Sequence, residues 1–207
     1  HRLHFHAARG SALTSVPPVG NMDVVEAIYH RRAVREYTSE LVDQETLNSL
    51  IHAAIQAPSA VNQQPWAFAV VRDQTLLDRI SRESKRHMLG TLPAVAASEH
   101  FRKLLSDPDF HIFYHAPALI VISAVAASPW AVEDCSLAAE NLMLATHAKG
   151  LGSCWIGFAQ PWLASPAGKA ALGLPAAYVP VAPIIVGRPK TAPPPVPRKT
   201  PEIRWIA

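Results

Sequence analysis

An apolar run at residues 117–125, broken only by Ser123, constrains the fold of this chain more than any other feature. Leucine, isoleucine, valine and isoleucine follow one another at 119–122 without a polar break. Successive side chains of a strand point to opposite faces, so a strand of this composition must be covered on both sides. Pro117 fits only at its start, because proline donates no ladder hydrogen bond. We therefore expect a buried strand in a sheet with helices around it.

The rest of the chain divides into further strands and helices. Short apolar runs at 67–72, 153–157 and 179–186 predict three more strands. Helical spacing and capping residues predict helices that begin at Asp23 and end near Arg31, and others at 43–57, 74–86, 132–149 and 162–172. Residues 88–113 show no clear period. These elements leave two architectures open, an α+β fold or a layered α/β sheet.

The composition fits one globular domain with extended ends. The chain has 207 residues, of which 49% are hydrophobic and 17% charged, enough apolar material for a core. Its 19 prolines outnumber its 9 glycines and gather near the two ends, a pattern typical of extended arms. We expect residues 1–21 to be an extension without a function. Residues 22–207 are predicted to form one domain with a C-terminal arm from about residue 188.

Charge, cysteine content and hydropathy argue against several classes of protein. The net charge of +3 is not gathered into a basic stripe, which makes nucleic-acid binding a poor hypothesis. Two cysteines imply no disulfide framework and fit a reducing compartment, so redox chemistry would need a cofactor. No stretch reaches the roughly 20 apolar residues of a membrane helix, and the first residues lack the apolar core of a secretory signal. We predict a cytoplasmic protein that binds neither membrane nor nucleic acid.

Two polar segments have side chains suited to a flavin nucleotide. Arg31, Arg32 and Arg35 stand where a helix gives way to a turn, and guanidinium groups suit phosphate oxygens and the electron-rich edge of a reduced flavin. The loop 57–66 offers donors and acceptors that match the uracil-like edge and ribityl hydroxyls. Taken alone, the arginines can equally form a solvated surface, and the loop can be an ordinary turn.

Two later segments are less specific by themselves. Gly-Leu-Gly-Ser-Cys-Trp-Ile-Gly at 150–157 matches no phosphate-loop spacing, and a helix C-cap leading into a strand explains its glycines equally well. The proline-rich arm can lie across a partner and deliver Arg198 to a phosphate, or it can be a solvated tail. The order of the segments therefore matters more than any one of them.

In that order, the segments resemble those of the FMN-dependent nitroreductase family. The match consists of Arg-Arg-x-Val-Arg-x-Tyr at 31–37, Ala-Pro-Ser-x-x-Asn-x-Gln-Pro-Trp at 57–66, Ala-Glu-Asn-Leu-Met-Leu-Ala at 139–145, Gly-Leu-Gly-Ser-Cys-Trp-Ile-Gly at 150–157, Pro-Ile-Ile-Val-Gly at 183–187 and the late Arg198. The likeness spans residues 22–198. It implies an α+β fold with a mainly antiparallel central sheet surrounded by helices and an extended C-terminal arm.

The same resemblance implies a homodimer with one FMN at each subunit interface. The arginines of the first motif would approach the phosphate and the flavin edge, the polar loop residues the ribityl chain or pyrimidine ring, and the late arginine the phosphate. The implied cofactor contacts are Arg31, Arg32, Ala33, Arg35, Pro58, Ser59, Asn62, Gln64, Gly152, Ile156, Gly157 and Arg198. Ala33 departs from the family pattern, which usually has serine there, so one hydroxyl contact is missing.

The implied activity is ping-pong transfer of two electrons from NAD(P)H through FMN to a nitroaromatic, a quinone or a similar acceptor. FMN rather than a side chain carries this chemistry. Nothing in the sequence distinguishes NADH from NADPH or identifies the acceptor. Two alternatives stay open: a flavin-binding storage or sensing module without turnover, and a related flavin reaction such as ene reduction or dehalogenation.

A metal enzyme is a further alternative, prompted by His111 and His115. The two histidines share a face only if their segment is helical. Their apolar neighbours make packing near a strand the better interpretation, and no third ligand sits at a recognisable spacing. We therefore predict no metal.

Overall fold

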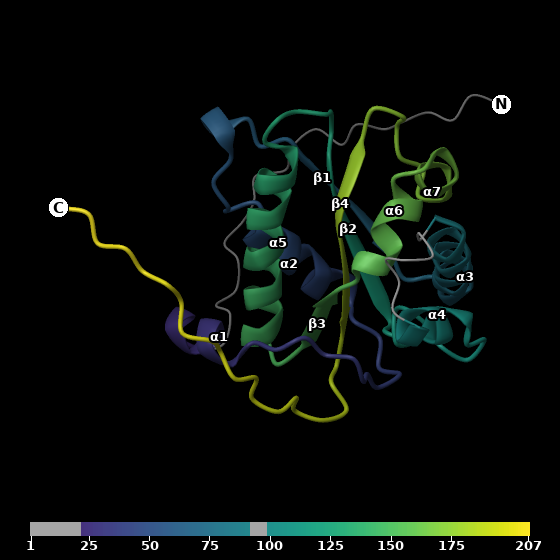
Figure 1. The fold of residues 1–207 in the computed structure, drawn as a ribbon, viewed down its shortest axis with the longest axis horizontal. Helices are drawn as coiled ribbons and strands as arrows, with labels where there is room; N and C mark the ends of the chain where they lie inside the picture. The colour runs from purple at the N-terminus through teal and green to yellow at the C-terminus, as the bar shows by residue number, and fades with distance from the viewer. Residues whose placement is uncertain (1–21, 92–98) are drawn as a thin grey trace.

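A four-stranded sheet between two layers of helices forms the body of the protein (Figure 1). The computed structural model describes residues 22–91 and 99–207. Its strands are β1 (Trp66–Val71), β2 (Ala118–Ala124), β3 (Gly152–Trp155) and β4 (Val179–Gly187), in the spatial order β1-β2-β4-β3. Every neighbouring pair is antiparallel. The expected α+β fold with a mainly antiparallel sheet is confirmed.

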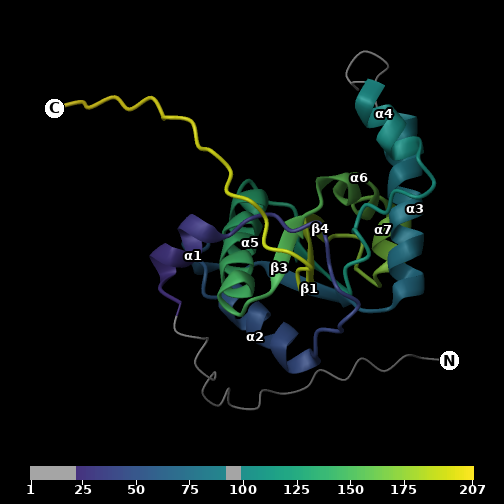
Figure 2. The same cartoon turned by 90° about the horizontal axis from the view of Figure 1, so that it is seen from below.

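The helices lie on both sides of this sheet. They are α1 (Val24–His30), α2 (Gln44–Ala54), η1 (Ala60–Asn62), α3 (Gln74–Thr91), α4 (Glu99–Ser106), α5 (Ala131–Ala148), η2 (Gly157–Ala159), α6 (Gln160–Leu163) and α7 (Pro166–Ala171). Helices α2 and α5 cover one face, and α3, α6 and α7 lie beyond the other (Figures 1 and 2). The sheet is therefore the middle layer of three.

Strand β2 explains why residues 119–122 follow one another without a polar break. Ile120 and Ile122 belong to the core cluster under α2 and α5, whereas Leu119 and Val121 belong to the cluster on the α3 side. All seven residues of the strand are buried. Neighbours on both sheet faces and both edges leave no position for a polar side chain, except the small Ser123.

Local signals place most helix ends correctly. Asp43 caps α2, because its carboxylate accepts a hydrogen bond from the Thr46 N–H at 2.7 Å. Gly150, with φ at +72°, follows the end of α5 as predicted. Three predictions were less accurate: α2 ends at Ala54 rather than 57, and β3 starts and ends earlier than 153–157. The helix expected at 162–172 divides into α6 and α7, because Ser165 caps the second of them just before a proline.

The segment 88–113, which showed no period in the sequence, contains helix in the part that the structure describes. Helix α3 continues to Thr91, and α4 follows at Glu99–Ser106. Few apolar side chains of these two helices are buried, among them Leu77 and Ile80 of α3 and Leu105 of α4. So few apolar positions give only a weak helical period in a short window of sequence.

Helix α1 and the C-terminal arm are the least enclosed parts of the described chain. Helix α1 buries Ala27 but exposes four large apolar side chains, Val24, Val25, Ile28 and Tyr29, to between 52% and 71%. The arm extends away from the body beyond residue 190 (Figures 1 and 2). The predicted extension 1–21 lies outside the described residues. Among the described helices, none is long and apolar enough to cross a membrane.

Candidate functional site

The edge strand β3 holds the first arginine motif in place. After α1 the chain extends, and Val34 donates its backbone N–H to the Ser153 carbonyl at 3.0 Å. Ala33 pairs with Ser153 in a parallel bridge. The Tyr37 hydroxyl donates to the Val34 carbonyl at 2.8 Å and closes the segment. The arginine motif and the motif that contains β3 therefore lie side by side, although they are far apart in sequence.

Gly152 is needed for this close approach. A Cβ atom added there would lie 2.6 Å from Cγ2 of Val34, a separation that packed side chains do not tolerate. At Gly157 an added Cβ meets nothing within 4 Å. The two glycines of the motif thus have different roles: Gly152 admits the arginine segment, and Gly157 borders open space.

That open space is a cavity of about 240 Å³ beside the two motifs. Its lining consists of Arg35, Met88, Ile112, Tyr114, Cys154, Trp155, Ile156, Gly157 and Phe158. Arg35 is the one residue of this lining with a permanent charge, and most of the others are apolar or aromatic. Such a surface suits a flat conjugated ring with an electron-rich edge.

The cysteine in this lining is not an activated nucleophile. Burial raises the pKa of the Cys154 thiol, although the nearby Arg35 and Arg31 act in the opposite direction. Burial also raises the pKa of Cys135, to about 12. Both cysteines are free. Each is a neutral thiol at physiological pH, so neither offers the thiolate that redox or nucleophilic chemistry requires.

Positive charge gathers where α1 meets α5. Arg31 lies 3.6 Å from the Glu140 carboxylate, measured from Nε to Oε1. Arg32 donates through Nη1 to the carbonyls of Tyr29 and Arg31, each at 2.7 Å. The Nε atom of Arg32 is buried and finds no hydrogen-bond partner within the described chain.

His147 on α5 also has a buried nitrogen, Nε2, that finds no hydrogen-bond partner in the described part of the chain. Burial lowers the pKa of His147, and the positive charges of His30, Arg31 and Arg32 lower it further. A buried, unpaired guanidinium N–H is unfavourable, and a phosphate oxygen would satisfy it with a strong, charge-assisted bond. The residues of this cluster therefore fit the phosphate of FMN.

The polar loop 57–66 is held by its own hydrogen bonds and by a contact with α5. Its Ser59 hydroxyl accepts a hydrogen bond from the Gln64 N–H at 2.9 Å, and the Gln64 amide donates to Asn62 at 3.0 Å. Val61, Asn62 and Gln64 have φ values between 44° and 55°, a left-handed backbone that is strained for residues other than glycine. The buried Asp134 carboxylate holds the loop by accepting from the N–H of Ala60 at 2.9 Å. Pro58, Asn62 and Gln64 are exposed.

Within one chain the predicted site residues form two groups. The loop contacts the beginning of α5 at Asp134, whereas Arg31 contacts Glu140 further along the same helix. Figure 1 shows η1 and α1 at opposite ends of α5. The structure thus brings together Arg31, Arg32, Ala33, Arg35, Gly152, Ile156 and Gly157, but not Pro58, Ser59, Asn62 and Gln64. Arg198 lies exposed in the arm.

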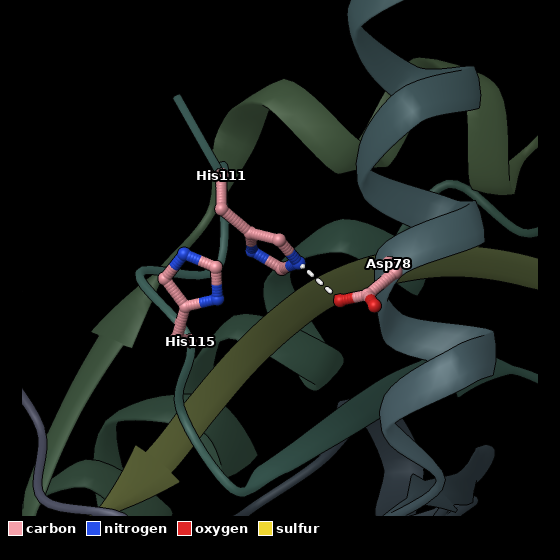
Figure 3. A group of neighbouring side chains, drawn as sticks. All are labelled: Asp78, His111 and His115. Atoms are coloured by element: carbon pink, nitrogen blue, oxygen red, sulfur yellow. Dashed lines mark hydrogen bonds and ion pairs between the residues drawn. The ribbon is translucent and has the colours of Figure 1, made fainter. Parts of the chain in front are cut away.

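The two histidines lie beside an acidic residue that the sequence analysis missed. His111 Nε2 is 3.1 Å from Asp78 Oδ1, and the His111 and His115 rings are 4.5 Å apart (Figure 3). Burial lowers the pKa of His111, as does His115, while Asp78 raises it. Residues 111–115 form turns rather than a helix. Asp78 and the cavity residue Tyr114 were both missed because only the folded chain brings them to these places.

Comparison with known proteins identifies the family. The nitroreductase family model matches residues 28–188. A candidate NADH dehydrogenase/NAD(P)H nitroreductase of Methanothermobacter thermautotrophicus is 35% identical over 144 residues, covering 67% of this chain but only 63% of that protein. An iodotyrosine deiodinase of Thermotoga neapolitana is 31% identical over 127 residues, covering 59% of this chain and 67% of the relative.

A solved structure agrees with the sequence matches. The crystal structure of a nitroreductase with bound FMN from Bacteroides fragilis superposes with a TM-score of 0.74 and 26% identity, covering 90% of this chain and 98% of that one. The chain belongs to the nitroreductase family, a class of flavoprotein oxidoreductases.

The two glycines of the β3 motif give a matched test of how the arginine segment is held. We expect Gly152→Ala to lower the free energy of unfolding by about 1–3 kcal/mol, because the new Cβ collides with the stiff Val34 side chain. Gly157→Ala should stay within about 0.5 kcal/mol of the wild type. Urea unfolding of both variants measures this difference, and equal stabilities would show that Val34 does not pack against Gly152.

Proposed function

We propose that this protein is an FMN-dependent oxidoreductase that passes two electrons from NAD(P)H to a nitroaromatic, a quinone or a similar acceptor in ping-pong turnover. The observation that carries the proposal is the arginine segment along β3, with a buried Arg32 Nε that lacks a partner, beside the cavity bordered by Arg35. The unpaired Arg32 Nε and the cavity residue Arg35 belong to the same extended segment. Bound FMN supplies the electron transfer between donor and acceptor.

The residues of the chain have distinct tasks in this proposal. Arg31 and Arg32 bind the phosphate, and Arg35 lies against the conjugated ring, where its fixed charge favours the negative charge that develops at the ring edge. Gly157 leaves the ring face open, since nothing lies within 4 Å of an added Cβ. No side chain is assigned as a general acid or base.

The acceptor is constrained by the cavity only in its chemical class. Tyr114 and Phe158 present aromatic surface beside the place proposed for the flavin ring, which favours aromatic acceptors. A second candidate function is reductive dehalogenation, which the likeness to an iodotyrosine deiodinase supports. A storage or sensing module remains the alternative without turnover.

A homodimer would complete the site. In this proposal, Ser59, Asn62 and Gln64 of one subunit reach the FMN held by the arginine motif of its partner, because the two groups lie apart within one chain. The apolar side chains exposed on α1 support this assembly, since a helix that buries only one residue needs a further surface to cover it.

The arm, with Arg198, would lie across the partner. Trp205 and Ile206, each more than 90% exposed, would become covered there.

The first test concerns the phosphate contact. We expect Arg32→Ala to weaken FMN binding by about 10- to 100-fold, because a charge-assisted hydrogen bond is worth about 1.5–3 kcal/mol. Arg79→Ala, which removes the same charge from an exposed position on α3, should leave the affinity unchanged. Titration of the apoprotein by the quenching of flavin fluorescence measures both affinities. Equal affinity for all three proteins removes Arg32 from the site.

The second test asks whether one FMN is bound by two subunits. Arg32→Ala and Asn62→Ala homodimers should each have low NAD(P)H-dependent reductase activity. After mixing, unfolding and refolding together, about a quarter of the sites should be intact, because half of randomly paired dimers are mixed and one of their two sites has both groups. If both groups came from one subunit, no site would be restored and the mixture would stay as inactive as its parents.

A further inference from the structure

Two histidines and one aspartate converge on one side of α3 (Figure 3). The histidines line a surface cavity that Arg35 of the arginine motif also borders. One ligand atom from each of Asp78, His111 and His115 lies within 4.8 Å of the other two. Asp78 comes from the helix, and the histidines come from the loop before β2. In Figure 3 the His111 ring points toward Asp78, and the His115 ring lies beside it. All three groups are ligands for divalent transition metals.

The loop is shaped so that both imidazoles face the same place. Tyr114 and His115 have φ values of 51° and 54°, and Tyr114 donates its N–H to the His111 carbonyl at 2.9 Å. These left-handed residues turn the chain back, which brings a ring four positions later against the first. Neither residue is glycine, so the surrounding structure must stabilise this conformation.

A buried lysine ties the loop to the helix that carries Asp78. Lys85, on α3, donates to the carbonyls of Asp107 and Phe110 at 2.8 Å and 2.6 Å. Ser81, also on α3, accepts from the N–H of Ile112 at 3.1 Å. The aspartate and the histidines are therefore held on a common framework rather than meeting by chance at a mobile surface.

We propose that Asp78, His111 and His115 bind one divalent transition-metal ion, with Zn²⁺ as the representative. Two imidazoles and a carboxylate are a recurring ligand set, and it leaves a coordination position for water. With bonds of about 2.0–2.2 Å, ligand atoms of a tetrahedral site lie about 3.3–3.6 Å apart. The Asp78–His111 separation of 3.1 Å is already near that value. The exposed His115 can close the remaining gap by rotating its side chain.

Binding of the ion moves one proton on the His111 ring and breaks one weak hydrogen bond. The N–H of Phe113 donates to His111 Nδ1 at 3.2 Å, so the neutral ring carries its proton on Nε2, facing Asp78. The ion replaces this proton at Nε2. The ring then carries its proton on Nδ1, and the long hydrogen bond from Phe113 opens.

The competing explanation is an aspartate–histidine hydrogen bond alone. That bond involves Asp78 and His111, and it gives no reason for the position of the His115 ring, whose centroid lies 4.5 Å from that of His111. An ion accounts for all three side chains. It would also fix one wall of the cavity, because Ile112 and Tyr114 of the same loop line it. The ion site does not depend on the proposed flavin chemistry.

The experiment counts metal in the chain of residues 1–207, without an added histidine tag. The protein is incubated with Zn²⁺, dialysed, and analysed for zinc per chain by mass spectrometry. We expect the wild type to retain one ion more than His115→Ala or Asp78→Asn, with an affinity at least about 100-fold higher, since even outer-shell changes lower metal affinity by 10- to 100-fold. His100→Ala, which removes an exposed histidine from α4, should bind like the wild type.

Two outcomes would overturn the proposal. One is zinc retained equally by the wild type and His115→Ala, which would assign the ion to other histidines of the chain. The other is no retained zinc in the wild type. Thermal melting without metal checks that His115→Ala folds normally, which is expected because this side chain is exposed. Replacement by Co²⁺ gives a second readout, a visible absorption that the two site variants should lack.

Discussion

The hydrogen bond from the Val34 N–H to the Ser153 carbonyl is the contact on which the candidate site depends. It attaches the segment after α1 to the edge strand β3, and it can form only because Gly152 has no side chain. Through it, Arg35 reaches the cavity, and Arg31 and Arg32 stay near α5. An edge strand normally presents unpaired backbone groups. Here part of the β3 edge pairs with the segment that carries Arg31, Arg32 and Arg35, and this pairing positions the three arginines.

The sequence predicted the helices and strands better than it predicted the tertiary contacts between them. The run at 119–122 identified a doubly covered strand because strand geometry sends successive side chains to opposite faces, and both faces are apolar here. The arginine motif and the 150–157 motif were recognised separately, but their adjacency follows from the strand order and from the extended chain after α1. Tyr114 and Asp78 carry no local signal. Their roles arise from tertiary contacts with residues far away in sequence.

Two places in the described chain hold left-handed residues other than glycine, the loop 57–66 and the turn that ends at His115. Each is fixed by a polar side chain from a neighbouring helix, Asp134 for the loop and Lys85 for the approach to the turn. Strain of this kind persists where the surrounding structure over-determines it, and it is common at ligand sites. In our proposals, the first place contacts the FMN of a partner subunit and the second binds a metal ion. In both cases the strained segment presents polar side chains at the surface.

The visible spectrum of the FMN-loaded protein, recorded without oxygen before and after addition of NADPH or NADH, tests the central claim most directly. The account predicts a yellow protein whose flavin absorption bleaches with at least one of the two donors and returns when a quinone or a nitroaromatic is added. A protein that binds FMN but keeps its colour with both donors would contradict the proposed turnover and favour a storage or sensing role. A protein that stays colourless after incubation with FMN would contradict the site itself.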